Sequence, residues 1–292
     1  MPELSADQIT AYLDRIGVRD ALQDTLKDAS RGAASRAASK DALKAALKDA
    51  LKPDVDTLRL LHRAHVLTVP FENLSVHLPG EETSLELPAL VDKIVTRRRG
   101  GFCYELNGLF AALLEAIGFG VERMAARTYS AERGAFTNSP LDHLALRVTD
   151  AAGEVWLADV GFGKHSELPL RYTERGAQPD PFGTFQLVET ADGLLDVQLN
   201  GSPQYRIDPR ALELADFEMG RWWQVTSPAS VFRRNLMCSL PTPDGRVTLN
   251  GRRLITTDAD GRREKVLKED AAVLAAYREL FGIELAAVPT IA

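Results

Sequence analysis

The chain has 292 residues, of which 45% are hydrophobic and 26% are charged, so it can form an ordinary globular core. Its net charge of −6 argues against a general nucleic-acid surface, and no apolar run is long enough to span a bilayer. Two isolated cysteines provide neither a disulfide framework nor a zinc-binding Cys-x-x-Cys pair. With no N-terminal signal sequence apparent, we expect a cytoplasmic protein.

The N-terminal part combines one capped helix with a segment of unusual composition. Ser5 and Gln8 have capping-box spacing, and we expect the helix that they begin to end at Gly17. Residues 27–52 consist almost wholly of Ala, Lys, Asp, Ser, Arg and Leu. The first half of this segment has too few large apolar residues to offset the entropy of ordering, so we expect a flexible arm. Leucines at every fourth position then predict one short surface helix over 40–51.

The rest of the first 120 residues is predicted to be helical. Apolar residues three and four apart predict one helix that Asp54 or Asp56 caps and Pro70 terminates. The same spacing predicts a helix through residues 87–94 and another that begins near Cys103 and stops at Gly118.

After Gly120 the period of the apolar pattern changes from 3.6 to 2, which is typical of strands. Strands are predicted at residues 121–129, 141–149, 154–160, 185–189, 195–199, 204–207, 231–240, 247–249 and 254–257. Asp208 and Pro209 have the N-cap and N1 chemistry of a helix, which we expect to run to Gly220. A last helix is predicted to end before Gly282.

Cys103 is the strongest candidate for a nucleophile. It follows Arg-Gly-Gly-Phe and stands in the first turn of its predicted helix, where free N–H groups and the helix dipole favour a thiolate. A lone cysteine is more often a buried structural residue, but the glycine turn before it and two later segments reverse that preference. Nothing near Cys238 in the sequence supplies a base or a helix start.

A cysteine nucleophile requires a base and a group that orients the base, and His143 and Asp159 are the candidates. His143 lies on one predicted strand, and Asp159 interrupts an apolar run on the next, where a buried carboxylate requires a partner. The set Cys103, His143 and Asp159 therefore has the logic of a catalytic triad. From the residues alone it indicates a thiol acyl-transfer or hydrolytic centre, and papain-like peptidases and transglutaminases share the order.

The other histidines are weaker candidates. His62 and His65 are interpreted as surface or packing residues, and without a third ligand their i, i+3 spacing does not indicate a metal site. His77 and His165 stand in predicted loops without apparent partners.

The segment 99–108, Arg-Gly-Gly-Phe-Cys-Tyr-Glu-Leu-Asn-Gly, resembles the active-site signature of the arylamine N-acetyltransferases. Further segments that resemble this family, in order along the chain, are 70–74, 142–144, 159–163, 227–232 and 238–245. The ordered set covers essentially the whole chain. Residues 27–52 have no family counterpart that we recognise.

The resemblance implies an α+β fold of three domains with a papain-like triad of Cys103, His143 and Asp159. Residues 1–120 would form a helical bundle domain that carries the catalytic cysteine and the atypical insert at 27–52. Residues 121–220 would form a β-barrel domain with a connecting helix, and residues 221–292 an α/β lid domain.

The resemblance also implies acetyl-CoA as donor, arylamines or hydrazines as acceptors, and a ping-pong mechanism through acetyl-cysteine. Phe71 and Phe162 match family positions that line the acceptor pocket, Gly161 and Gly163 match the loop near the donor, and Thr242 matches a position associated with CoA. The implied partners are therefore small molecules, with no nucleic acid, membrane or metal, while a homo-oligomer stays open.

Two other functions stay open at this point. A related amide synthase would use the same triad to close a macrolactam from a carrier-bound acyl chain. A catalytically silent binding or scaffold protein is the third alternative, and the intact triad argues against it. Arginine pairs at 233–234, 252–253 and 262–263 are candidates for contact with CoA phosphates, and the sequence assigns none of them.

Overall fold

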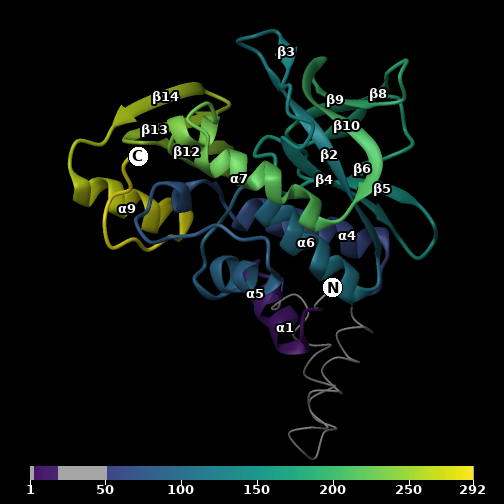
Figure 1. Ribbon diagram of the computed structural model, residues 1–292, viewed down its shortest axis with the longest axis horizontal. Helices are drawn as coiled ribbons and strands as arrows, with labels where there is room; N and C mark the ends of the chain where they lie inside the picture. The colour runs from purple at the N-terminus through teal and green to yellow at the C-terminus, as the bar shows by residue number, and fades with distance from the viewer. Residues whose placement is uncertain (1–2, 19–50, 292) are drawn as a thin grey trace, which may run out of the picture.

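A computed structural model of the protein describes residues 3–18 and 51–291 (Figure 1). Most of the predicted insert at 27–52 lies outside these residues, so its arm and its helix over 40–51 stay predictions. Leu51, the first described residue after the gap, is only 1% exposed and belongs to the core of the helices. In the described part, no helix is long and apolar enough to cross a membrane.

Helices form the first part of the described chain. They are α1 (Ala6–Arg15), α4 (Val55–Thr68), α5 (Leu87–Leu90), the π-helix η3 (Val91–Thr96) and α6 (Cys103–Ile117), with a short 3-10 helix η2 (Leu74–Val76). The predicted capping box of Ser5 is present, and Asp54 caps α4 by accepting a hydrogen bond from the Thr57 N–H. Gly118 ends α6 in the left-handed conformation, as predicted.

α6 is the central element, because it is buried on nearly every side. It packs against α5 on one side and against strands β2 and β4 on the other, and Figure 1 shows α4 and α6 lying along the sheet. Its side chains Leu106, Phe110 and Leu113 are fully buried. The start of this helix is therefore held in a fixed position between the helices and the sheet.

A strongly curved antiparallel sheet follows. Its described strands, in chain order, are β2 (Gly120–Ser130), β3 (Ala135–Phe136), β4 (His143–Thr149), β5 (Val155–Ala158), β6 (Leu170–Arg171), β7 (Gln178–Asp180), β8 (Gly183–Glu189), β9 (Leu195–Leu199) and β10 (Ser202–Leu212). They pair in the order β6-β5-β4-β2-β10-β9-β8-β7, and β3 pairs with β2. Side chains alternate between the two faces of β4: Leu144 and Leu146 pack on the helical core, while Ala145 faces a second core inside the curve of the sheet.

A second sheet, here called the C-terminal sheet, joins residues 71–72 to the last part of the chain. It contains β1 (Phe71–Glu72), β11 (Met237–Thr242), β12 (Gly245–Asn250), β13 (Arg253–Asp258) and β14 (Gly261–Val266), in that spatial order. Helix α9 (Asp270–Phe281) covers one face and ends at Gly282, as predicted. Because β1 pairs with β11, the strand Phe71–Glu72 fixes this sheet against the helices.

Two predictions between residues 208 and 240 are wrong. The helix expected from Asp208 is instead the end of β10, because this segment pairs with β2; Pro209 is tolerated there since it falls within a register shift between Ile207 and Ala211. Helical structure begins only with η4 (Leu214–Phe217) and α7 (Glu218–Thr226). The strand expected from residue 231 begins as helix α8 (Val231–Arg234), which Ser230 caps, and becomes β11 afterwards.

The fold is thus a mixed helix and strand fold, and its described residues form three hydrophobic cores. One lies among the helices and the adjoining face of the curved sheet, one inside that sheet, and one between the C-terminal sheet and α9. The division of the chain into domains at residues 120 and 220 stays a prediction.

Candidate active site

Two glycines bring the chain to Cys103 through a space that admits no side chain. A Cβ atom on Gly100 would lie 1.9 Å from the Pro70 carbonyl oxygen, and one on Gly101 would lie 2.8 Å from Glu105 Oε2. Phe102 then takes an extended conformation as the N-cap of α6, and Cys103 is the first residue of that helix, as predicted. The thiol is 3% exposed.

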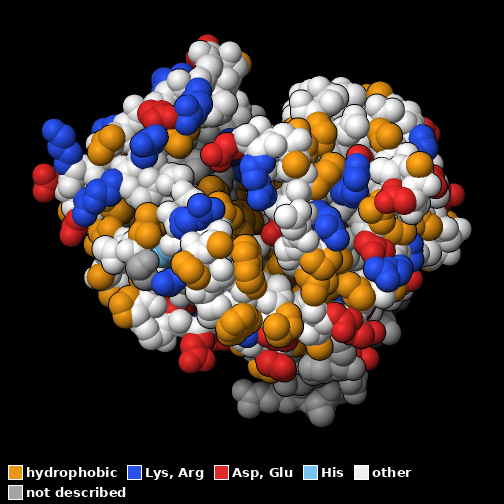
Figure 2. Space-filling view, turned by 45° about the horizontal axis from the view of Figure 1, so that its top comes forward, with side chains coloured by type: hydrophobic (Ala, Val, Ile, Leu, Met, Phe, Trp, Pro, Cys, Tyr) orange, Lys and Arg blue, Asp and Glu red, His pale blue; other side chains and the backbone are white. Residues whose placement is uncertain are grey.

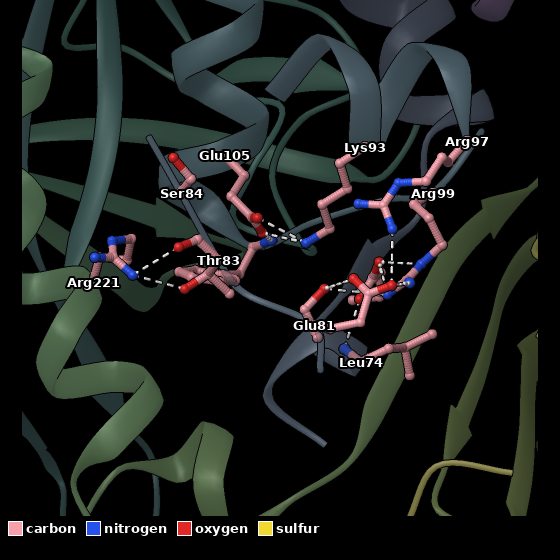
Figure 3. Close-up of polar contacts among 12 residues, drawn as sticks. Leu74, Glu81, Thr83, Ser84, Lys93, Arg97, Arg99, Glu105 and Arg221 are labelled. Atoms are coloured by element: carbon pink, nitrogen blue, oxygen red, sulfur yellow. Dashed lines mark hydrogen bonds and ion pairs between the residues drawn. The ribbon is translucent and has the colours of Figure 1, made fainter. Parts of the chain in front are cut away.

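Two buried ion pairs lie next to the segment Gly100–Cys103 and stabilise it (Figure 3). Lys93 Nζ lies 2.7 Å from Glu105 Oε1, and Glu105 Oε2 accepts a hydrogen bond from the Phe102 N–H at 3.2 Å. Arg99 pairs with Glu72 at 2.9 Å. Burial raises the pKa of Glu105 despite the opposing charge of Lys93, whereas for Glu72 burial is outweighed by Arg99 and the pKa falls.

His143 and Asp159 form a buried pair beside the start of α6. His143 is the first residue of β4, Asp159 follows the last residue of β5, and His143 Nε2 lies 2.6 Å from Asp159 Oδ2. Burial disfavours the imidazolium, but the charge and hydrogen bond of Asp159, with smaller contributions from Cys103, raise the pKa of His143 to about 10. Because the Nε2 of His143 is hydrogen-bonded to Asp159, the Nδ1 of His143 is the ring nitrogen that can contact the Cys103 thiol.

The Asp159 carboxylate is held by donors on every side. Its Oδ1 accepts hydrogen bonds from Asn107 Nδ2 at 2.8 Å and from the Gly161 N–H at 2.9 Å. Burial raises its pKa, but the charge of His143 and these donors outweigh burial, so the pKa of Asp159 falls below its usual value. The carboxylate therefore stays charged and fixed in orientation.

Two positioning residues were not predicted from the sequence. Asn107 lies one turn after Cys103 and, besides contacting Asp159, accepts a hydrogen bond from the Val160 N–H at 2.9 Å. His62 is fully buried. Its Nε2 accepts a hydrogen bond from the Asp159 N–H at 3.1 Å, and its Nδ1 donates one to the Glu167 carbonyl. The spacing of Asn107 from Cys103 is a sequence signal for a shared helix face; for His62 the sequence holds no comparable signal.

The two histidines without apparent partners in the sequence, His77 and His165, both have partners in the structure. His165 Nδ1 lies 3.1 Å from the Tyr205 hydroxyl, and burial lowers the pKa of His165 to about 3, so this ring is neutral. His77 Nε2 donates to the Phe232 carbonyl at 2.8 Å. These partners were not apparent because they are far away in the sequence.

Aromatic and glycine residues surround the pair. The Phe162 ring packs against His143 at 5.2 Å and against Tyr205 at 4.7 Å between ring centroids. A Cβ on Gly161 would lie 2.7 Å from the Cys103 Cα, and Gly163, at a φ of +81°, lies against the Phe71 ring. The structure thus places Gly161 next to Cys103, Phe162 next to His143, and Phe71 and Gly163 next to each other.

A cavity opens beside this constellation. Its lining residues are Val66, Val69, Phe71, Asp159, Val160, Gly163, His165, Ser239, Pro241 and Arg246. Figure 2 shows a hollow between the part built on the C-terminal sheet and the part built on the curved sheet, with hydrophobic side chains at its base. Thr242 ends β11 and is not among the lining residues, so its predicted contact with CoA stays a prediction.

The second cysteine lies elsewhere. Cys238 is on β11, fully buried in the core between the C-terminal sheet and α9. Burial, with the charge of Glu72, raises the pKa of its thiol well above the usual value. Among the described residues, no group of three or more His, Cys, Asp or Glu side chains could hold a metal ion.

The sequence of this chain is similar to those of known acetyltransferases. A family model described as N-acetyltransferase matches residues 54–290. The arylamine N-acetyltransferase of Mycobacterium tuberculosis is 35% identical over 239 residues, which are 80% of this chain and 84% of that protein. The arylamine N-acetyltransferase of Escherichia coli is 34% identical over 79% of this chain and 83% of its own length.

A solved structure agrees with these relatives. The arylamine N-acetyltransferase of Mycobacterium marinum, in complex with CoA, superposes with a TM-score of 0.71 at 32% identity. The superposition covers 80% of this chain and 88% of that one.

Proposed function

The chain belongs to the arylamine N-acetyltransferase family, and from this premise we propose that it moves the acetyl group of acetyl-CoA to the amino nitrogen of arylamines and hydrazines. The observation that carries the proposal is the buried pair of His143 and Asp159 next to a cysteine at the start of α6. This arrangement supplies a nucleophile, a base and a group that orients the base.

In the first half-reaction the Cys103 thiolate attacks the carbonyl carbon of the acetyl thioester. A C–S bond to Cys103 forms, the C–S bond to CoA breaks, and the CoA thiolate takes a proton from imidazolium His143. Backbone N–H groups at the start of α6 are candidates for stabilising the oxyanion. Asp159 keeps the imidazole in one tautomer and stabilises its charged form.

In the second half-reaction the acceptor nitrogen attacks acetyl-Cys103. A C–N bond forms, the C–S bond breaks, and His143, now neutral, removes the proton that the amine loses. Cys103 returns as the thiolate beside imidazolium His143. Because CoA leaves before the amine reacts, we expect ping-pong kinetics.

The surrounding residues fit the two substrates. Phe71 and Phe162 present aromatic faces against which the flat ring of an arylamine can pack. Because Gly161 and Gly163 have no side chain, their loop presents only backbone on the side of the catalytic site where the pantetheine arm of the donor would pass. A relative has been solved in complex with CoA, which supports CoA as the donor's carrier, and Thr242 is a candidate for a further contact with it.

The test is an initial-rate assay of the purified full chain with acetyl-CoA and a simple arylamine. We expect CoA release that depends on the amine, an N-acetylated product, and parallel double-reciprocal plots. Intersecting plots would overturn the two-step mechanism. Absence of transfer to arylamines and hydrazines, with ring closure of a carrier-bound acyl chain instead, would favour the amide synthase.

A further inference from the structure

The guanidinium of Arg246 faces the active-site cavity without a counter-charge. Arg246 is on β12 and lines the cavity together with Phe71, Asp159 and Gly163. Its one polar partner is Ser239, whose Oγ accepts a hydrogen bond from Nη1 at 3.2 Å. In the described part of the chain, no carboxylate lies within ion-pair distance of it.

Strand register explains why this side chain points to the cavity. Directly opposite residues of an antiparallel pair share one face, and Arg246 is opposite Pro241, while Ser239 is opposite Thr248. Pro241 and Ser239 line the same cavity. The intervening residue Val247 packs on the other face, in the core beneath α9. The guanidinium is therefore held towards the cavity by the pleat of the sheet.

Other arginines at low exposure have a carboxylate or several backbone carbonyls as partners, which makes Arg246 unusual. Arg99 pairs with Glu72, and Arg123 pairs with Glu115. Arg15 donates to several backbone carbonyls, among them that of Ile94. Arg246 has a single neutral hydroxyl, which satisfies one of the five N–H donors of a guanidinium.

The charge persists under physiological conditions. Burial lowers the pKa of Arg246 to about 10, so the group is still protonated near neutral pH. Asp159, the carboxylate on the same cavity wall, is already occupied by His143, Asn107 and the Gly161 N–H. A partly buried cation of this kind is stabilised by an anion, and the planar guanidinium matches a carboxylate or phosphate with two parallel hydrogen bonds.

We propose that Arg246 is an anion-binding group of the active-site cavity and that it takes an oxyanion carried by one of the two substrates. This inference rests on the proposed function, because it treats the cavity as the place where donor and acceptor meet. The oxyanion has two sources: a carboxylate on the ring of the acceptor, or a phosphate of the donor. Both present the oxygen pair that a guanidinium recognises.

The experiment compares Arg246→Met and Arg246→Lys with the wild type in two matched substrate pairs. The acceptor pair is 4-aminobenzoate and its methyl ester, which differ in the carboxylate charge. The donor pair is acetyl-CoA and S-acetylpantetheine, which differ in the phosphates. Arg278→Met is the control, because Arg278 is on α9, which covers the other face of the C-terminal sheet, its side chain is 63% exposed, and it does not line the cavity.

If the acceptor supplies the anion, Arg246→Met raises the KM for 4-aminobenzoate at least tenfold and changes the KM for the ester less than twofold. If the donor supplies it, the same contrast appears between acetyl-CoA and S-acetylpantetheine. In either case Arg246→Lys retains part of the preference, and Arg278→Met behaves as the wild type. Equal changes within both pairs, or no change in a folded variant, would overturn the inference.

A binding measurement separates this inference from the proposed function. The shift in melting temperature that CoA and 4-aminobenzoate cause is read without turnover, in the wild type and in Arg246→Met. A wild type that transfers no acetyl group contradicts the proposed function. A wild type that one of these anions stabilises, and an Arg246→Met variant that it stabilises much less, supports the anion site regardless of turnover. Equal stabilisation of both proteins contradicts it.

Discussion

His143 Nε2 and Asp159 Oδ2 are 2.6 Å apart, and the two side chains are 2% and 0% exposed. The contact joins the beginning of β4 to the end of β5, so the register of two neighbouring strands fixes it. Because the carboxylate outweighs the effect of burial, the imidazolium is the stable form of His143 up to a pH of about 10. The pair therefore places a positively charged imidazole next to Cys103.

Asp159→Asn should slow alkylation of Cys103 near neutral pH. Without the carboxylate charge, burial lowers the pKa of His143, so the ring is neutral and no longer stabilises a thiolate. We expect the rate with iodoacetamide to fall at pH 7 and to recover as the pH rises, and acetyl transfer to fall by about 10²–10⁴-fold. The measurement is the alkylation rate of Cys103 between pH 6 and pH 9.

Asp150→Asn is the matched control for this substitution. Asp150 is also buried and accepts a hydrogen bond from Trp156 Nε1, at a position outside the candidate site. Its alkylation profile should follow the wild type. Identical profiles for Asp159→Asn and the wild type would show that the carboxylate does not act on the thiol.

The same pair predicts how stability depends on pH. Asp159 has a lowered folded-state pKa, so its contribution is present above its unfolded value of about 3.9 and is lost as the pH falls through the folded value. His143 has a raised pKa, so its contribution is present below about 6.5 and is lost as the pH rises towards 10. The difference in unfolding free energy between wild type and Asp159→Asn should be largest between these limits. Urea unfolding at pH 3, 6 and 10 measures it, and a constant difference would contradict the assignment.

Lys93→Met tests the buried ion pair behind Cys103. Removal of Lys93 leaves the Glu105 carboxyl buried without its partner, and loss of one partner costs about 3–5 kcal/mol in typical buried pairs. The control is Arg97→Met, since Arg97 pairs with Glu81 but is 42% exposed, where an ion pair contributes about 0–1 kcal/mol. Urea midpoints compare the two variants. Equal destabilisation would mean that the Lys93–Glu105 pair does not bear on the stability of the turn.

Much of the fold and of the candidate site could be predicted because the signals are local. The period of the apolar residues located α4, α6 and most strands, and the caps at Ser5, Asp54 and Gly118 are confirmed. The local signature around Cys103 predicted a helix start, and the period of 2 predicted the strand that contains β4. Each of these features depends on residues within a few positions of one another.

What could not be predicted depends on distant contacts. Asp208 and Pro209 have good helix-start chemistry, but pairing of β10 with β2 overrides it. His62 contacts the Asp159 N–H across 97 positions, and His165 contacts Tyr205 across 40, so neither partner is visible locally. The uncompensated charge of Arg246 is likewise apparent only when the neighbours of β12 are known.

Phe162→Ala should weaken aromatic acceptors more than small aliphatic hydrazines. The Phe162 ring packs on His143 and Tyr205, and aromatic packing contributes about 0.5–1.5 kcal/mol beyond area burial, which corresponds to a rise in KM of about 2- to 13-fold. Phe136→Ala is the control, because Phe136 packs on Tyr129 away from the site. The assay compares KM for both acceptor types. Equal losses would assign Phe162 a structural role.

The most direct test of the central claim is mass spectrometry of the protein after incubation with acetyl-CoA alone. We expect one acetyl group, located on Cys103 and discharged when an arylamine is added. Cys103→Ser should carry no label and show no turnover, because a serine hydroxyl is far less acidic than a thiol and His143 is a poor base for it. An acetyl group on Cys238, or steady turnover by Cys103→Ser, would contradict the account.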